Sequence, residues 1–231
     1  MKQCDISKVE PLLELFKAPQ PQRDAQWHEQ FYAIVADASF RCETPQVFAG
    51  PDGFPYFSLL SPEPFKPFDS FCLSNLAEAA TEKGFGVTIN RRSDGADWVF
   101  SYGDMLALRL TGTLEPQSTG PGEPPKKITI EKEERVFSGT PSETYLPSCA
   151  RGVIRQFMQR GLGIQEPKVL LLHRPKDPKP MQLVFSVFRE QYQSDHQYFG
   201  VLHRLSWFLP RHYTITGVPM SSDLQKELVP L

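Results

Sequence analysis

The sequence has no long apolar segment, and its first residues are mostly polar. Its longest apolar runs are residues 169–172 and 183–188, whereas a transmembrane helix needs roughly 20 apolar residues. Residues 1–7 contain no apolar stretch, and a signal peptide would need one of about 7–15 residues near this position. We therefore expect a protein that is not inserted in a membrane and that stays in the cytoplasm.

Cysteine is scarce, and the four cysteines stand at least 30 residues apart. Zinc motifs and the disulfide frameworks of small secreted proteins place their cysteines closer together. Two of the four lie near the starts of expected helices, where the helix dipole lowers a thiol pKa, but apolar neighbours favour inert buried thiols. We therefore expect free thiols in a reducing compartment at Cys4, Cys42, Cys72 and Cys149.

Recognisable catalytic, phosphate-binding and metal-binding patterns are missing as well. There is no Gly-x-Ser-x-Gly nucleophile motif. The Gly-x-Gly pairs beginning at Gly84 and Gly161 follow expected helices, whereas a dinucleotide fingerprint precedes a helix. His196 and His203 are seven residues apart on one expected helix, whereas two metal ligands on one helix are usually spaced three or four residues apart. We expect no catalytic residues, no cofactor and no metal site.

Proline and phenylalanine are abundant, with 22 and 17 residues among 231. The prolines stand between apolar runs, so they indicate loops of a folded chain rather than disorder. Residues 115–125 contain six Pro or Gly and no large apolar residue, which predicts a linker. The linker separates an N-terminal domain, residues 1–114, from a C-terminal domain, residues 126–231.

Apolar periodicity and capping residues predict an α+β protein. The expected helices begin near Val9, Asp24, Asp69 or Ser70, Gly103, Ser148 and Asp195, and two of them end at left-handed caps at Gly84 and Gly161. A hairpin turn is expected at residues 50–53. Strands are expected at residues 46–49, 56–60, 87–89, 98–101, 128–130, 169–173, 183–188 and 213–218. Each domain should hold a small, mostly antiparallel or mixed sheet covered by helices.

A short internal similarity links the two domains. Residues 83–101 and 160–186 both run in the order helix, glycine, strand, turn and strand, with similar residues at the glycines and in the second strand. Two explanations remain open at this point. The similarity is either an old duplication or the same helix-ending device used twice.

Charge is distributed unevenly along the chain. Residues 1–125 carry 10 Lys/Arg against 17 Asp/Glu, a net charge of −7, and residues 148–231 carry 11 against 6, a net charge of +5. Solvated surfaces of opposite sign, or attraction between the domains, explain this best. An acidic partner of the C-terminal half is the alternative, and we expect no nucleic-acid partner because aromatic residues do not interleave the basic ones.

Several segments resemble the SseB (enhanced serine sensitivity) family in both domains. They are Phe31-Tyr32, residues 55–60, residues 84–90 and residues 139–141, and the resemblance extends over most of residues 9–220. Arg91 follows Asn90 where family members often have proline. The resemblance implies the two-domain α+β fold and a bacterial cytoplasmic setting, and it implies no catalytic residues.

The sequence favours a non-enzymatic binding or adaptor protein with a protein partner. Aromatic residues surround a proline-rich loop, and basic residues cluster in the C-terminal half. The candidate partner-binding residues are Phe65, Phe68, Arg151, Arg155, Arg174, Lys176 and Lys179. A small-ligand-binding regulatory protein, or an enzyme with a site at the domain interface, is the alternative.

Overall fold

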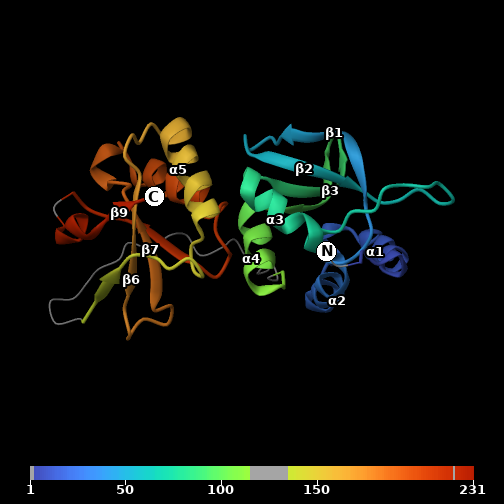
Figure 1. The fold of residues 1–231 in the computed structure, drawn as a ribbon, viewed down its shortest axis with the longest axis horizontal. Helices are drawn as coiled ribbons and strands as arrows, with labels where there is room; N and C mark the ends of the chain where they lie inside the picture. Colours follow the sequence, from blue (N-terminus) through green and yellow to red (C-terminus); the bar gives the residue numbers. More distant parts are fainter. Residues whose placement is uncertain (1–2, 115–134, 221) are drawn as a thin grey trace. The chain divides into compact units, whose positions relative to one another are not determined.

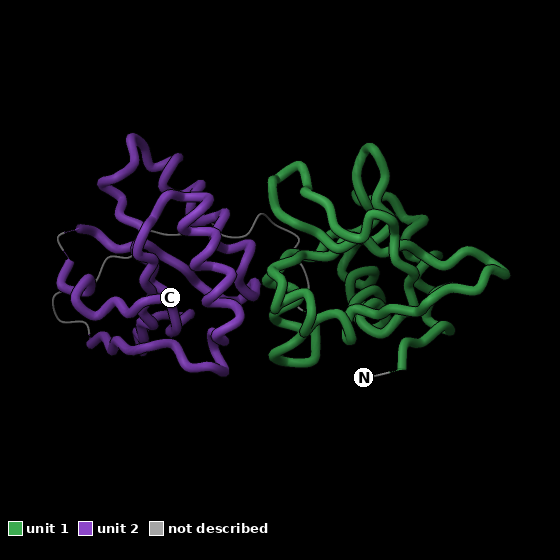
Figure 2. The backbone as a smooth tube through the Cα atoms, turned by 45° about the horizontal axis from the view of Figure 1, so that its top comes forward, with its two compact units in different colours: residues 1–117 green, residues 118–231 purple. Residues whose placement is uncertain are grey.

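The computed structural model describes residues 3–114, 135–220 and 222–231. The chain divides into two compact units, residues 1–117 and 118–231, which are coloured separately in Figure 2. The expected linker at residues 115–125 and the expected strand at residues 128–130 lie outside the described residues. Among the described helices, none combines the length and the apolar character that a membrane span requires.

Unit 1 contains a four-stranded mixed sheet. Its strands are β1 (Arg41–Ala49), β2 (Pro55–Leu60), β3 (Gly86–Arg92) and β4 (Gly95–Phe100), and they lie in sequence order. The β1–β2 and β3–β4 pairs are antiparallel, whereas β2 and β3 are parallel. A parallel pair needs a crossover between its strands, and α3 provides it (Figure 1).

Four helices pack against this sheet and close the core of unit 1. They are α1 (Val9–Phe16), α2 (Ala25–Val35), α3 (Leu73–Lys83) and α4 (Tyr102–Thr111). All four contribute buried residues to one apolar cluster with alternate residues of the sheet. Sequence signals set their ends: Asp24 caps α2 by accepting the N–H of Trp27 at 2.8 Å, and Gly84 ends α3 with φ 82°.

Unit 2 contains a five-stranded mixed sheet. The strands β5 (Phe137–Gly139), β6 (Lys168–His173), β7 (Met181–Phe185) and β8 (Thr214–Gly217) lie in sequence order, and the short β9 (Val229–Pro230) also pairs with β6. Among the described strand pairs of this unit, only β7–β8 is parallel. Two sheets of mixed direction with their helices confirm the α+β fold class.

The helices of unit 2 are α5 (Ser148–Leu162) and α6 (Asp195–Ser206), with short 3-10 helices at Arg189–Gln191 and Asp223–Glu227. The expected end of α5 at Gly161 is wrong. The helix continues through that residue, and the left-handed cap is Gly163, with φ 72°. The N–H of Ile164 then bonds to the carbonyl of Met158 at 3.0 Å, which closes the helix end.

The two units share the order of helix, glycine, strand, turn and strand that the internal similarity suggests, but the strand before the helix pairs differently in each unit. In the similar segments, α3 and α5 each lead into an antiparallel strand pair. The strand before α3 is parallel to the strand after it, whereas β5 is antiparallel to β6. The units also share an antiparallel pair, a helix and a parallel strand, in β1-β2-α3-β3 and β6-β7-α6-β8.

The expectation that all four cysteines are free is wrong. Cys4 and Cys72 form a disulfide, with Cα atoms 5.5 Å apart across a separation of 68 residues. Asp5 pairs with Ala38 and thereby holds the start of the chain against the body of unit 1. The spacing of the cysteines in the sequence does not predict the Cys4–Cys72 disulfide, because it depends on a tertiary contact. The other two cysteines, Cys42 and Cys149, are half-buried thiols, and burial raises the pKa of Cys42.

Candidate functional site

The proline-rich loop after β2 presents one aromatic side chain to solvent. We call residues 61–70 the Phe65 loop, and it projects from the body of unit 1 in Figures 1 and 2. Phe65 lies at a turn in this loop with φ 60°, and its relative exposure is 106%. Phe68 is half-buried. Of the two aromatic residues expected to bind a partner, only Phe65 is therefore fully presented.

Both ends of the Phe65 loop are fixed to the sheet side of unit 1. At its start, Asn90 Oδ1 accepts the N–H of Ser61 at 2.7 Å, and Asn90 Nδ2 donates to Ser61 Oγ at 2.9 Å. Just beyond its end, Phe71 exchanges two backbone hydrogen bonds with Phe40 at 2.7 and 2.8 Å. The loop is thus tied down at its base, while its tip stands in solvent.

Ion pairs add local restraint within the Phe65 loop. The Glu63 carboxylate pairs with Lys66 and lies 3.1 Å from Arg41 Nη2. The hydrogen bond and the charge of Lys66 lower the pKa of Glu63. These groups are exposed, so each pair contributes little stability. Their role is to limit the conformations that the tip can adopt.

Two arginines of α5 donate hydrogen bonds to backbone carbonyls of unit 2. Arg151 donates from Nε to the carbonyl of Leu146 and from Nη2 to that of Pro141, both at 2.8 Å. Arg155 Nη1 donates to the carbonyl of Leu231 at 2.9 Å. These bonds tie the segment before α5 and the last residue to the helix. The geometry gives both arginines a positioning role, and their part in partner binding stays a prediction.

The other three basic residues lie together in the turn between β6 and β7. Arg174 pairs with Asp177 inside the turn, with Nη1 and Oδ2 3.2 Å apart, and its side chain is largely buried. Lys176 and Lys179 are exposed. The turn therefore offers two solvated ammonium groups, and a role for them in partner binding also stays a prediction.

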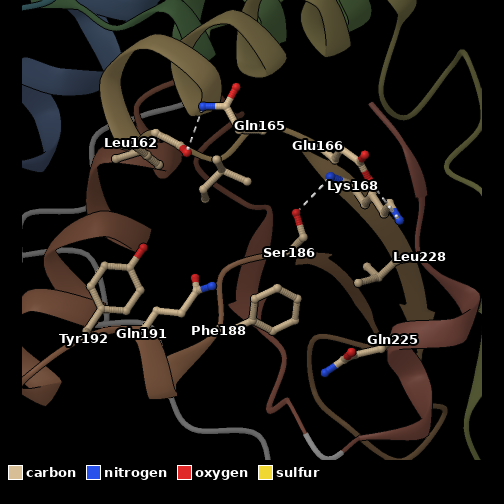
Figure 3. A pocket seen from close by; sticks show the side chains of 12 residues that line it. Leu162, Gln165, Glu166, Lys168, Ser186, Phe188, Gln191, Tyr192, Gln225 and Leu228 are labelled. Atoms are coloured by element: carbon tan, nitrogen blue, oxygen red, sulfur yellow. Dashed lines mark hydrogen bonds and ion pairs between the residues drawn. The ribbon is translucent and has the colours of Figure 1, made fainter.

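A pocket that no sequence pattern predicts lies at one end of the sheet of unit 2 (Figure 3). Its volume is about 840 Å³, within the range of small-molecule sites. It forms where α5 ends, β6 begins and β7 ends, and both 3-10 helices of unit 2 contribute residues. Only folding brings these segments together. The one feature visible beforehand was a glycine helix cap, which predicts a chain reversal and no cavity.

Ser186 is the buried polar residue of this pocket, with a relative exposure of 3%. Its Oγ accepts the N–H of Lys168 at 2.9 Å, and its own N–H donates to the carbonyl of Lys168 at 3.0 Å. Lys168 Nζ in turn lies 3.9 Å from Glu166 Oε2. The rim thus holds one cation and one anion, which face each other.

Two aromatic rings face the same pocket. Phe188 is half-buried, and like Leu228 it packs against an apolar cluster formed by β6, β7 and Val218. Tyr192 is half-buried, and its ring centroid lies 6.0 Å from that of Tyr198. Burial, with a smaller effect of Tyr198, raises the pKa of Tyr192. Its phenol therefore stays protonated at neutral pH and can donate a hydrogen bond.

Within residues 3–114, 135–220 and 222–231, no three His, Cys, Asp or Glu side chains lie close enough together to hold a metal ion. The fold and these two surfaces describe a two-unit α+β protein with a presented aromatic residue in one unit and a pocket in the other. No protein-family model, curated protein or solved structure matches the chain.

Proposed function

We propose that the protein is a non-enzymatic binding or adaptor protein that recruits a protein partner through Phe65, and that it is related to the SseB family. The full exposure of Phe65 on a loop fixed at its base supports the proposal. A single exposed apolar residue is common in proteins. What distinguishes Phe65 is its left-handed backbone conformation, which is uncommon for a bulky residue.

The conformation of Phe65 suits an anchor residue. A left-handed conformation costs a bulky residue roughly 1–2 kcal/mol, so it persists only where neighbouring contacts hold it. A loop that is already ordered loses little conformational freedom on binding. Aromatic anchors that fill a partner's pocket carry much of the energy of a typical interface. The expected partner is therefore a protein with an apolar pocket.

The test uses a photo-crosslinking amino acid at position 65 to capture the partner, followed by binding measurements with the purified pair. We expect Phe65→Ser to weaken binding at least tenfold. Phe137→Ser is the matched control, because Phe137 is an exposed phenylalanine of unit 2, at 57%. Unchanged affinity of the Phe65→Ser variant would reject Phe65 as the anchor.

The proposal also places the protein in a bacterial cytoplasm, as the family resemblance implies. Disulfides are rare in that compartment, so we expect Cys4 and Cys72 to be thiols in growing cells and to pair on oxidation. Because Cys72 is buried, their state is read by acid quenching of the cells, alkylation of the denatured protein and mass spectrometry. A pair that is protected from alkylation would instead indicate an oxidising compartment.

A further inference from the structure

The pocket of unit 2 holds a hydroxyl group whose hydrogen-bonding capacity is only partly used. Ser186 Oγ accepts the N–H of Lys168, and among the described residues no group accepts its own proton. A serine hydroxyl can donate one hydrogen bond and accept two. Because the N–H and the Oγ of Ser186 both bond to the backbone of Lys168, its position in the pocket is set before any ligand arrives (Figure 3).

The electrostatics of the pocket favour an uncharged ligand. Lys168 and Glu166 cancel each other's charge at the rim. The C-terminal end of α5 also lines the pocket through Leu162 and Gly163. A helix C-terminus carries a partial negative charge, which disfavours anions. The one carboxylate of the lining, Glu166, is already paired with Lys168 and so is not left to hold a cation. The remaining polar side chains of the lining are neutral.

The remaining lining combines amides with an apolar wall. Three glutamine side chains lie around the opening, and each amide can both donate and accept hydrogen bonds. Phe188 and Leu228 supply apolar surface next to Ser186. Phe188 and Ser186 line the same pocket two residues apart in the chain, so a ligand ring against Phe188 can carry a carbonyl toward the Ser186 hydroxyl (Figure 3). An amide nitrogen on that carbonyl would find acceptors among the glutamines.

We propose that this pocket binds a small uncharged molecule with an aromatic ring and a carboxamide, whose carbonyl accepts a hydrogen bond from Ser186. The ring lies against Phe188, and the amide faces the glutamine side chains. This site lies in unit 2 and does not involve the Phe65 loop. Its test is therefore independent of the proposed recruitment of a protein partner.

The test is an NMR titration of the ¹⁵N-labelled full-length protein with three compounds of similar shape. They are benzamide, which is neutral, benzoate, which is an anion, and benzylamine, which is a cation. We expect benzamide to shift the amide signals of residues 186–192 with about millimolar affinity, as its size allows. Benzoate and benzylamine should bind at least tenfold more weakly.

Variants of the pocket sharpen the test. Ser186→Ala should weaken benzamide binding about fivefold, the effect of one neutral hydrogen bond. Because this change also removes the acceptor of the Lys168 N–H, Gln191→Ala at the exposed rim serves as a second variant that leaves the fold intact. Gln193→Ala, which is exposed but does not line the pocket, is the control and should bind benzamide normally.

Three results would overturn the proposal. One is the absence of signal shifts around Ser186 at tens of millimolar benzamide. Another is benzoate or benzylamine binding as tightly as benzamide, which would show that the pocket does not select for a neutral amide. Binding of benzamide that is insensitive to Ser186→Ala and to Gln191→Ala would also refute the assigned contacts.

Discussion

Asn90 shows at the scale of one residue how a loop is attached to a sheet. Its φ of 52° lies in the left-handed region, which asparagine tolerates better than most residues. Its side chain binds Ser61 at the start of the Phe65 loop and donates to Asp97 Oδ2 in β4 at 2.8 Å. One amide group therefore connects β3, β4 and the base of the Phe65 loop.

Replacing Asn90 separates the backbone and side-chain contributions. We expect Asn90→Ala to lower the free energy of unfolding by about 4 kcal/mol, because it removes three hydrogen bonds of about 1 kcal/mol each and leaves a strained backbone. Asn90→Gly removes the same bonds but relaxes the backbone, so we expect a loss of about 3 kcal/mol. Urea denaturation measures both, and equal losses would show that the conformation carries no cost.

Helix ends are decided at the scale of the element, and α5 illustrates the rule. Gly163 adopts the left-handed conformation that ends the helix, whereas Gly161, two residues earlier, lies inside it. A helix interior favours alanine over glycine by up to about 1 kcal/mol. A left-handed position favours glycine by a similar amount.

The two glycines should therefore respond oppositely to alanine. We expect Gly163→Ala to destabilise unit 2 by about 1 kcal/mol. Gly161→Ala should be neutral or slightly stabilising. Alanine stabilises a helix interior relative to glycine, but its Cβ atom would lie 3.1 Å from the Phe157 ring, and this close contact offsets part of the stabilisation. Thermal denaturation of both variants provides the comparison. A larger loss at Gly161 would place the helix end at that residue.

The Cys4–Cys72 disulfide fixes a terminal segment against the N-terminal end of α3. In an oxidising buffer we expect Cys4→Ser to lower the free energy of unfolding by up to about 4 kcal/mol, because a bond that closes 68 residues restricts the unfolded chain. In a reducing buffer the variant and the natural protein should be equally stable. A difference that persists under reduction would mean that the Cys4 side chain acts through packing.

At the scale of the whole molecule, each unit has its own sheet and its own helices. We expect residues 1–114 and 126–231, expressed separately, to unfold cooperatively, as small domains do. Circular dichroism during thermal denaturation is the measurement. Limited proteolysis of the full chain should first cut within residues 115–125, and fragments without secondary structure would contradict the expectation.

The sequence by itself determined the features that depend on neighbouring residues. The cap of α2 at Asp24, the end of α3 at Gly84 and the turn between β1 and β2 all follow from local chemistry. The α+β class follows from the same signals. Where local signals competed, the expectation failed: α3 begins at Leu73 rather than near Asp69, because the chain before it pairs Phe71 with Phe40.

Only the tertiary structure decided what depends on distant segments. The parallel pairing of β2 with β3, the Cys4–Cys72 disulfide and the environment of Ser186 each join residues that no local pattern connects. Ser186 looked like an ordinary polar residue at the end of a strand. Its burial beside Lys168 and Phe188 arises because α5, β6, β7 and two short helices converge there, and that convergence is set by packing of the whole unit.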